Sequence, residues 1–258
     1  MTVPGKSGPD RPTPRRSGRS GKKPVLKHPS DPVRSTGPGS EWGIGDAVAT
    51  YNIDRWGLGY FSINDKGNVT VAPMLEKGAT IDVMDVVSRA TLLGLRFPLV
   101  LRFQDLLRHR VESLNKAFND AIVENKYRGR YYGVFPIKVN QLREVVEEIV
   151  DAGRPMNYGI ECGSKAELFA ALATQDNHEA LIICNGYKDH SFVRAALLGT
   201  RIDKKIVLVV EKVEEVKMIV RVARKAGVDP SIGIRVRLAS KSSGIWASSG
   251  GESAKFGH

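Results

Sequence analysis

Lys138 is the residue of this sequence best placed to do covalent chemistry. It directly follows residues 132–137, an apolar segment with the length and composition of a β-strand. Proteins of the α/β class place ligands at strand ends, because the strand fixes a position and the loop after it gives access. A partly desolvated lysine amine there can lose its charge and attack an aldehyde to form a Schiff base. The alternative is a lysine whose charge simply extends into water.

Other polar side chains occupy equivalent places further along the chain. Glu161, Asn185 and Arg237 each stand at, or just after, the carboxyl end of a later apolar segment. The carboxyl ends of parallel strands lie at one edge of a sheet or barrel. We therefore expect these three side chains to share a site with Lys138.

The elements that would position these residues alternate regularly from residue 132 onward. Apolar strand candidates are followed by helix candidates, which predicts a parallel sheet with right-handed crossovers. The strands are expected at 132–137, 157–161, 180–184, 205–210 and 232–238, and the helices at 142–152, 165–173, 191–198 and 213–226.

A (β/α)8 barrel and a doubly wound sheet both have this alternation. Two features favour the barrel: no Gly-x-Gly-x-x-Gly opens the first helix, and side chains suited to chemistry recur at successive strand ends. Five strands do not close an eight-stranded barrel. We therefore expect an α/β fold in which residues 105–258 form an incomplete (β/α) barrel of the TIM type.

A small β/α lead-in is predicted over residues 41–104. Alternation at 47–53, and the segments 60–63 and 69–71 on either side of a turn, indicate strands. A helix is expected from about residue 80 to Gly94, and a strand at 99–103. Asp105 is then expected to cap a long amphipathic helix over residues 106–125.

The net charge of +11 is concentrated in residues 1–40, which carry nine Lys or Arg against two Asp. This segment is rich in Pro, Gly and Ser and cannot bury enough apolar surface to offset the entropy of ordering. We predict a disordered basic tail, and a solvated extension is favoured over a nucleic-acid-binding arm. The charge of the remaining residues is ordinary for a globular enzyme.

No run of about 18 apolar residues is present, so no membrane span is expected. The only two cysteines, Cys162 and Cys184, are too few for a disulfide scaffold and fit a reducing, cytoplasmic compartment. Each follows an apolar segment and is expected to be a small buried residue.

Several short motifs lie in a definite order between residues 42 and 257. The first are Leu-Arg-Phe at 101–103 and Phe-Pro-Ile-Lys-Val-Asn-Gln at 135–141. Others occupy residues 108–110, 158–168, 184–189, 233–238 and 248–257. Together they resemble the arginine decarboxylases, pyridoxal-phosphate enzymes of the alanine-racemase-like fold. The resemblance implies that Lys138 forms a Schiff base with the cofactor. It also implies that L-arginine is converted to agmatine and carbon dioxide, a step of polyamine synthesis.

The resemblance assigns further positions. Glu161 matches an acidic residue near the cofactor, Arg237 an arginine near the cofactor ring, and Lys255 a lysine near a dimer interface. A structural ion pair for Glu161 and a plain surface charge for Lys255 remain alternatives. The resemblance also implies a homo-oligomer with shared active sites and a requirement for Mg²⁺, although no cluster of carboxylates in the sequence identifies a metal site.

Several parts of the family's machinery have no counterpart among these 258 residues. They are the glycine-rich phosphate loop, the carboxylate that keeps the pyridine nitrogen protonated, and the residues donated across the dimer. We therefore expect a truncated and catalytically impaired chain. Two alternatives stay open: another pyridoxal-phosphate amino-acid decarboxylase or racemase of the same fold, and a noncatalytic pyridoxal-phosphate-binding remnant.

Overall fold

The structure, a computed structural model, describes residues 42–236. The predicted tail at 1–40, together with Arg237 and Lys255, lies outside these described residues. Within them, no helix is long and apolar enough to cross a membrane.

A five-stranded parallel sheet forms the larger part of the described structure. Its strands follow one another in space in the order of the chain: β4 (Val134–Pro136), β5 (Gly159–Cys162), β6 (Leu181–Cys184), β7 (Lys205–Val210) and β8 (Ser231–Ile234). The connecting helices are α5 (Arg143–Gly153), α6 (Lys165–Thr174), α7 (His190–Thr200) and α8 (Val213–Ala226). The strands and helices predicted from residue 132 onward are therefore confirmed, with shifts of a few residues at their ends.

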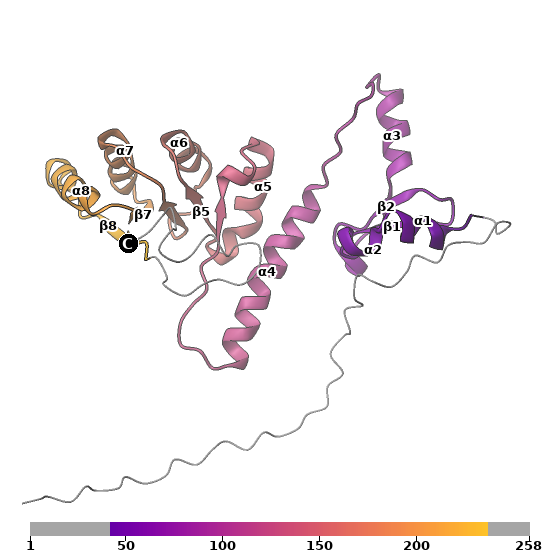
Figure 1. Cartoon of the computed structure of the whole chain (residues 1–258), viewed down its shortest axis with the longest axis horizontal. Helices are drawn as coiled ribbons and strands as arrows, with labels where there is room; N and C mark the ends of the chain where they lie inside the picture. The colour runs from indigo at the N-terminus through magenta and orange to yellow at the C-terminus, as the bar shows by residue number, and fades with distance from the viewer. Residues whose placement is uncertain (1–41, 237–258) are drawn as a thin grey trace, which may run out of the picture.

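The strand order separates the two folds that the sequence pattern allowed. A doubly wound sheet reverses its order at a switch point and carries helices on both faces. Here the order is sequential, and Figure 1 shows α5, α6, α7 and α8 side by side along one side of the strands. This arrangement is an arc of a (β/α) barrel.

The core of this arc lies between the strands and the helices. Ile160, Ile182 and Leu208 point from successive strands toward Leu168 and Phe192 of the helices, and none of these side chains is more than 2% exposed. Complete burial of such a side chain contributes about 1.5–3 kcal/mol. This apolar layer holds the carboxyl ends of the strands in a common register.

The amino-terminal part combines a small antiparallel sheet with short helices. The predicted hairpin is confirmed, because β1 (Phe61–Ile63) pairs with β2 (Val69–Val71), and a short β3 (Ile81–Asp82) adds to it. Asp82 then caps α3 (Val83–Leu92) by accepting the Met84 N–H at 2.8 Å. The Tyr60 hydroxyl lies 2.7 Å from Nδ1 of His109 and links this part to the barrel side.

Two predictions for this region are wrong. Residues 47–53 do not form a strand, because the chain here forms α1 (Ile44–Thr50) and the start of α2 (Ile53–Trp56). Asp46 accepts the Gly43 N–H at 2.9 Å, which closes the first helical turn and outweighs a short alternating pattern. Residues 99–103 are also irregular: among the described residues no strand lies alongside to pair with them, and Val100 is 75% exposed.

The long amphipathic helix is confirmed as α4 (Gln104–Glu124), but its cap is not Asp105. The helix begins after Phe103, so Asp105 lies in the first turn, where its charge is favoured by the helix dipole. Val111 is buried and packs against Val145 and Ile149 of α5. Arg108 adds ion pairs to Glu148 and Asp151 of the same helix. The contact fixes α4 against the first helix of the barrel.

Replacement of Asp189 tests whether the negative charge at the start of α7 stabilises the fold. This carboxylate receives hydrogen bonds from Lys165 Nζ at 2.7 Å, the Phe192 N–H at 2.8 Å and the Ser191 hydroxyl at 2.9 Å. Together these donors hold the pKa of Asp189 below its usual range, and the bond from Lys165 has the largest effect. A lowered folded-state pKa stabilises the fold above the unfolded value of about 4 and loses that contribution as pH falls below it. We expect Asp189→Asn to be less stable than the original chain at pH 7.

The difference between the two chains should shrink below about pH 4, measured by urea unfolding at several pH values. Asparagine still caps a helix, so the comparison isolates the charge. Lys165→Met should behave in the same way, because it removes the largest cause of the shift. A stability difference that is constant from pH 7 to pH 3 would contradict the prediction.

Candidate functional site

Lys138 lies in a short turn at the carboxyl end of β4. The turn, η2 (Ile137–Val139), is anchored by Ile137, which is 1% exposed, whereas the side chains of Lys138 and Val139 point into solvent. No hydrogen bond or ion pair within the described part of the chain engages the Lys138 amine. A primary amine in this position is accessible to an aldehyde.

The residues after Lys138 hold this turn in place. Gln141 donates from its side chain to the Lys138 carbonyl at 3.4 Å. Asn140 accepts the Leu142 N–H at 3.1 Å, two residues along the chain, and Leu142 is the residue that precedes α5. Asn140 therefore forms a local turn just before the helix, and Leu142, not Asn140, occupies the cap position.

Glu161 and Asn185 are brought into direct contact. Glu161 stands in β5 in register with Pro136 of β4, two residues before Lys138, and is 8% exposed. The side-chain amide of Asn185 donates to Glu161 Oε1 at 3.0 Å, and its backbone N–H donates to the Cys162 carbonyl at 2.9 Å. A buried carboxylate thus lies on the strand next to Lys138 with one oxygen already oriented.

A second polar cluster at the same edge was missed by the sequence analysis. It consists of Lys188, Glu211 and Glu215, which are buried and which we call the buried charge cluster, and Glu211 also pairs with Arg235, whose side chain is 44% exposed. Glu211 directly follows β7, just as Asn185 directly follows β6. A polar residue directly after a strand was therefore the signal in the sequence that could have predicted this cluster. The prediction named polar residues at the ends of the other four barrel strands and omitted the end of β7.

Glu211 connects two neighbouring strand ends. Its Oε1 accepts the Gly186 N–H at 3.0 Å and pairs with Arg235 Nη1 at 3.2 Å. Its Oε2 is buried and has no hydrogen-bond partner among the described residues. Arg235 directly follows β8 and lies two residues before Arg237, whose own position is not described. The carboxyl edge from β5 to β8 is thus linked by polar contacts.

Cys162 and Cys184 are buried between the strands and the helices, as predicted. They stand opposite each other in the β5–β6 register with their Sγ atoms 3.7 Å apart, and both are free thiols. The neighbouring thiol and burial raise the pKa of Cys162, so its thiolate is strongly disfavoured. These residues fill the core and do not supply a nucleophile.

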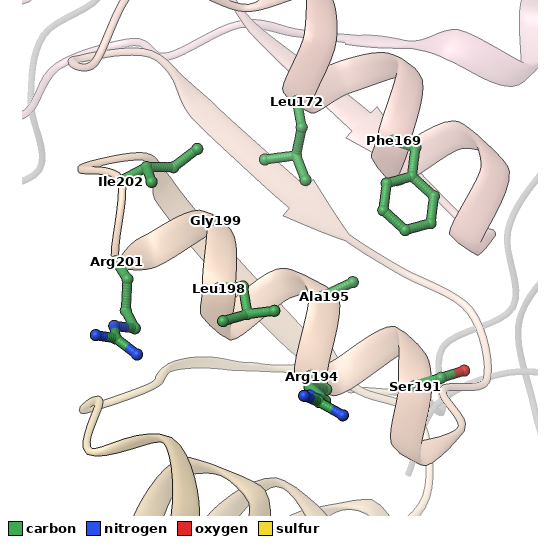
Figure 2. Close-up of a pocket in the computed structure, with 9 residues that line it drawn as sticks. All are labelled: Phe169, Leu172, Ser191, Arg194, Ala195, Leu198, Gly199, Arg201 and Ile202. Carbon is green, nitrogen blue, oxygen red and sulfur yellow. The ribbon is translucent and has the colours of Figure 1, made fainter.

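An open apolar groove lies elsewhere, between α6 and α7. Figure 2 shows Phe169 and Leu172 of α6 on one side and Ala195 and Leu198 of α7 on the other. It shares no residue with the strand-end site. Among residues 42–236 there is also no group of three or more His, Cys, Asp or Glu side chains that could hold a metal ion.

Comparisons with known proteins agree with this arrangement. The family model described as "Pyridoxal-dependent decarboxylase, pyridoxal binding domain" matches residues 108–258. The biosynthetic arginine decarboxylase of Parasynechococcus marenigrum is 47% identical over 216 residues, which cover 84% of this chain and 34% of the relative. That of Rhodopirellula baltica is 49% identical over 218 residues, covering 84% and 32%. The chain spans about a third of the length of the curated relatives it matches.

Solved structures of decarboxylases are also similar to this chain. The biosynthetic arginine decarboxylase from Campylobacter jejuni superposes with a TM-score of 0.68 at 35% identity, covering 80% of this chain and 32% of that one. A diaminopimelate decarboxylase from M. jannaschi superposes with a TM-score of 0.58 at 17% identity, covering 77% and 41%, which supports the fold alone. The partial α/β barrel predicted from the sequence is confirmed.

Proposed function

The chain belongs to the family of pyridoxal-dependent decarboxylases, and from this premise we propose that it carries the Schiff-base lysine, Lys138, of an arginine decarboxylase. The reaction is the conversion of L-arginine to agmatine and carbon dioxide, which supplies polyamine synthesis. One observation carries the proposal: a solvent-facing amine that has no partner among residues 42–236 follows β4, and a buried carboxylate stands on the adjacent strand.

The residues at this edge fit pyridoxal phosphate in their chemistry. Lys138 offers a solvent-facing amine, and the strand before it is fixed by Ile137 in the core. When bound, the cofactor supplies the electron sink that stabilises the charge left after carbon dioxide departs. Lys138 would hold the cofactor covalently, through a bond from its amine nitrogen to the aldehyde carbon.

Glu161 supports this chemistry through its charge. Asn185 orients Oε1, so Oε2 is available for a charge-assisted hydrogen bond to a protonated amine at the site. The buried position strengthens such a bond because little water competes for the carboxylate. In this proposal Glu161 and Arg237 bind the cofactor.

The wider proposal rests on the similarity to named arginine decarboxylases. It places the cofactor-binding barrel at residues 105–258, after a lead-in at 41–104 and a basic tail at 1–40. It also includes a homo-oligomeric assembly, a cytoplasmic location and a requirement for Mg²⁺. The Mg²⁺ requirement is supported by family resemblance alone.

Decarboxylation of four amino acids tests the substrate. The chain, supplied with pyridoxal phosphate and Mg²⁺, is incubated separately with L-arginine, ornithine, lysine and diaminopimelate, and carbon dioxide is measured. We expect arginine to give the highest rate, accompanied by agmatine, at a level below that of a full-length relative assayed in parallel.

A higher rate with another of the four would replace arginine by that substrate. Covalent capture of the cofactor without carbon dioxide from any of them would overturn the decarboxylase proposal for this chain and support a noncatalytic cofactor-binding protein.

A further inference from the structure

Lys188 is a charged residue with a fully buried side chain. The exposure of that side chain is 0%, and Glu215, its ion-pair partner at 3.5 Å, has a side-chain exposure of 6%. Removal of two charges from water costs several kcal/mol for each ion unless hydrogen bonds compensate. Burial of this pair is therefore tolerated because hydrogen bonds satisfy both groups.

The bonds of Lys188 join three separate elements. Its Nζ donates to the Gly186 carbonyl at 2.6 Å and to the Val209 carbonyl, in addition to its pairing with Glu215. These acceptors belong to the loop after β6, to β7 and to the first turn of α8. Hydrogen bonds from one ammonium group thus link the loop at the carboxyl end of β6 to the carboxyl end of β7.

Glu215 completes the arrangement from the side of α8. One of its oxygens accepts the Lys188 N–H at 2.8 Å, and the other accepts the Glu211 N–H at 2.8 Å. Glu211 in turn accepts the Gly186 N–H at 3.0 Å. Gly186 is therefore held through its N–H by Glu211 and through its carbonyl by Lys188, so the peptide groups before and after it are both fixed.

Gly186 directly follows Asn185. It has φ +75°, and a Cβ there would lie 2.7 Å from the Gly163 carbonyl oxygen, so the conformation and the close approach both require glycine. Because Asn185 is the neighbour of Gly186 in the chain, the position of its side-chain amide depends on the backbone of this loop. Displacement of Gly186 would withdraw the amide that orients the Glu161 carboxylate.

We propose that Lys188 is a positioning residue for the cofactor site. It holds the Gly186 carbonyl, and with it the loop that begins at Asn185, so that Asn185 orients Glu161 beside the strand that precedes Lys138. The inference rests on the proposed function at Lys138, and it assigns to the buried charge cluster a role in the geometry of that site. An ion pair that only stabilises the fold would give a different result in the following experiment.

The test compares five variants with the original chain. Lys188→Met removes the ammonium group, Asn185→Ala removes the proposed link to Glu161, and the double variant combines them. Val222→Ala, a cavity variant in the core of α8, controls for general loss of stability. The readouts are amide hydrogen exchange of Gly186, urea unfolding, and the rate of borohydride-trapped coupling of pyridoxal phosphate to Lys138.

We expect Lys188→Met to speed exchange of the Gly186 amide at least about tenfold, and to slow coupling at Lys138 by a similar factor. Val222→Ala should lower stability without either local effect. Because Lys188 acts through Asn185, the double variant should couple no more slowly than Asn185→Ala alone. Lys204→Met, which removes a lysine–carbonyl bond to Gln175 between α6 and β7, should leave coupling unchanged.

Independent, additive losses in the two single variants would overturn the inference. So would coupling in Lys188→Met that falls only as far as it does in Val222→Ala. If the original chain fails to couple pyridoxal phosphate, the proposed function fails. The exchange rate of the Gly186 amide is then a separate test of whether Lys188 holds the loop after β6. An unchanged rate in Lys188→Met would show that Lys188 does not hold it.

Discussion

Replacement of Lys138 with alanine is expected to abolish covalent coupling of pyridoxal phosphate to this chain. The Schiff base needs a primary amine at the end of β4, and alanine has none. The measurement is borohydride reduction followed by peptide mass analysis, with the adduct expected on the peptide that contains Lys138. Lys138→Arg should also fail, because a guanidinium keeps the charge but stays protonated and cannot form the bond.

A matched control separates this chemistry from general lysine modification. Lys212 is another lysine at the carboxyl edge, with its Nζ 3.8 Å from the centre of the Tyr187 ring. Lys212→Ala should leave the adduct on Lys138 intact. An adduct that persists in Lys138→Ala at the original level, on Lys212 or on any other lysine, would show that the assignment of Lys138 is wrong.

Substitution of Gly159 by alanine is expected to have the largest effect on stability. Gly159 starts β5, and an added Cβ would overlap the Leu181 carbonyl oxygen and lie 3.0 Å from the Leu181 N and C atoms. These are backbone atoms of the adjacent strand, so they can move only if β5 and β6 separate. We expect a loss of about 3 kcal/mol in the free energy of unfolding, measured by urea denaturation.

The control for this change is Gly163→Ala in the loop after the same strand. Among the described residues, a Cβ there would meet only Glu167 Oε2, at 3.7 Å, which is an ordinary contact. The expected change in the free energy of unfolding is below about 1 kcal/mol. If both substitutions lowered the free energy of unfolding equally, the lack of space beside the β6 backbone would not be the reason that residue 159 must be glycine.

The barrel portion could be predicted from the sequence because its signals are local and agree with one another. Strands such as Lys205–Val210 are apolar along their whole length, and the helices between them begin and end at residues that suit those positions. Gly227, for example, ends α8 at φ +64°, where glycine is favoured. Consistency of this kind fixes strand and helix order before any packing is known.

The amino-terminal part was predicted less well because its patterns are short. The alternation at 47–53 is compatible with a strand, yet one hydrogen bond between Asp46 and Gly43 suffices to start a helix there. The apolar residues at 99–103 could form a strand only beside another strand. A sequence pattern does not show whether such a neighbour exists.

By itself, the sequence determined the partial barrel, the place of Lys138 at the end of the first barrel strand, and the polar character of later strand ends. These follow from patterns within single segments. Only the tertiary structure decided that Asn185 orients Glu161, that Lys188 is fully buried, and that Glu211 and Glu215 fasten the same loop. Such contacts join residues more than twenty positions apart, and they depend on strand register and helix packing, which local patterns do not encode.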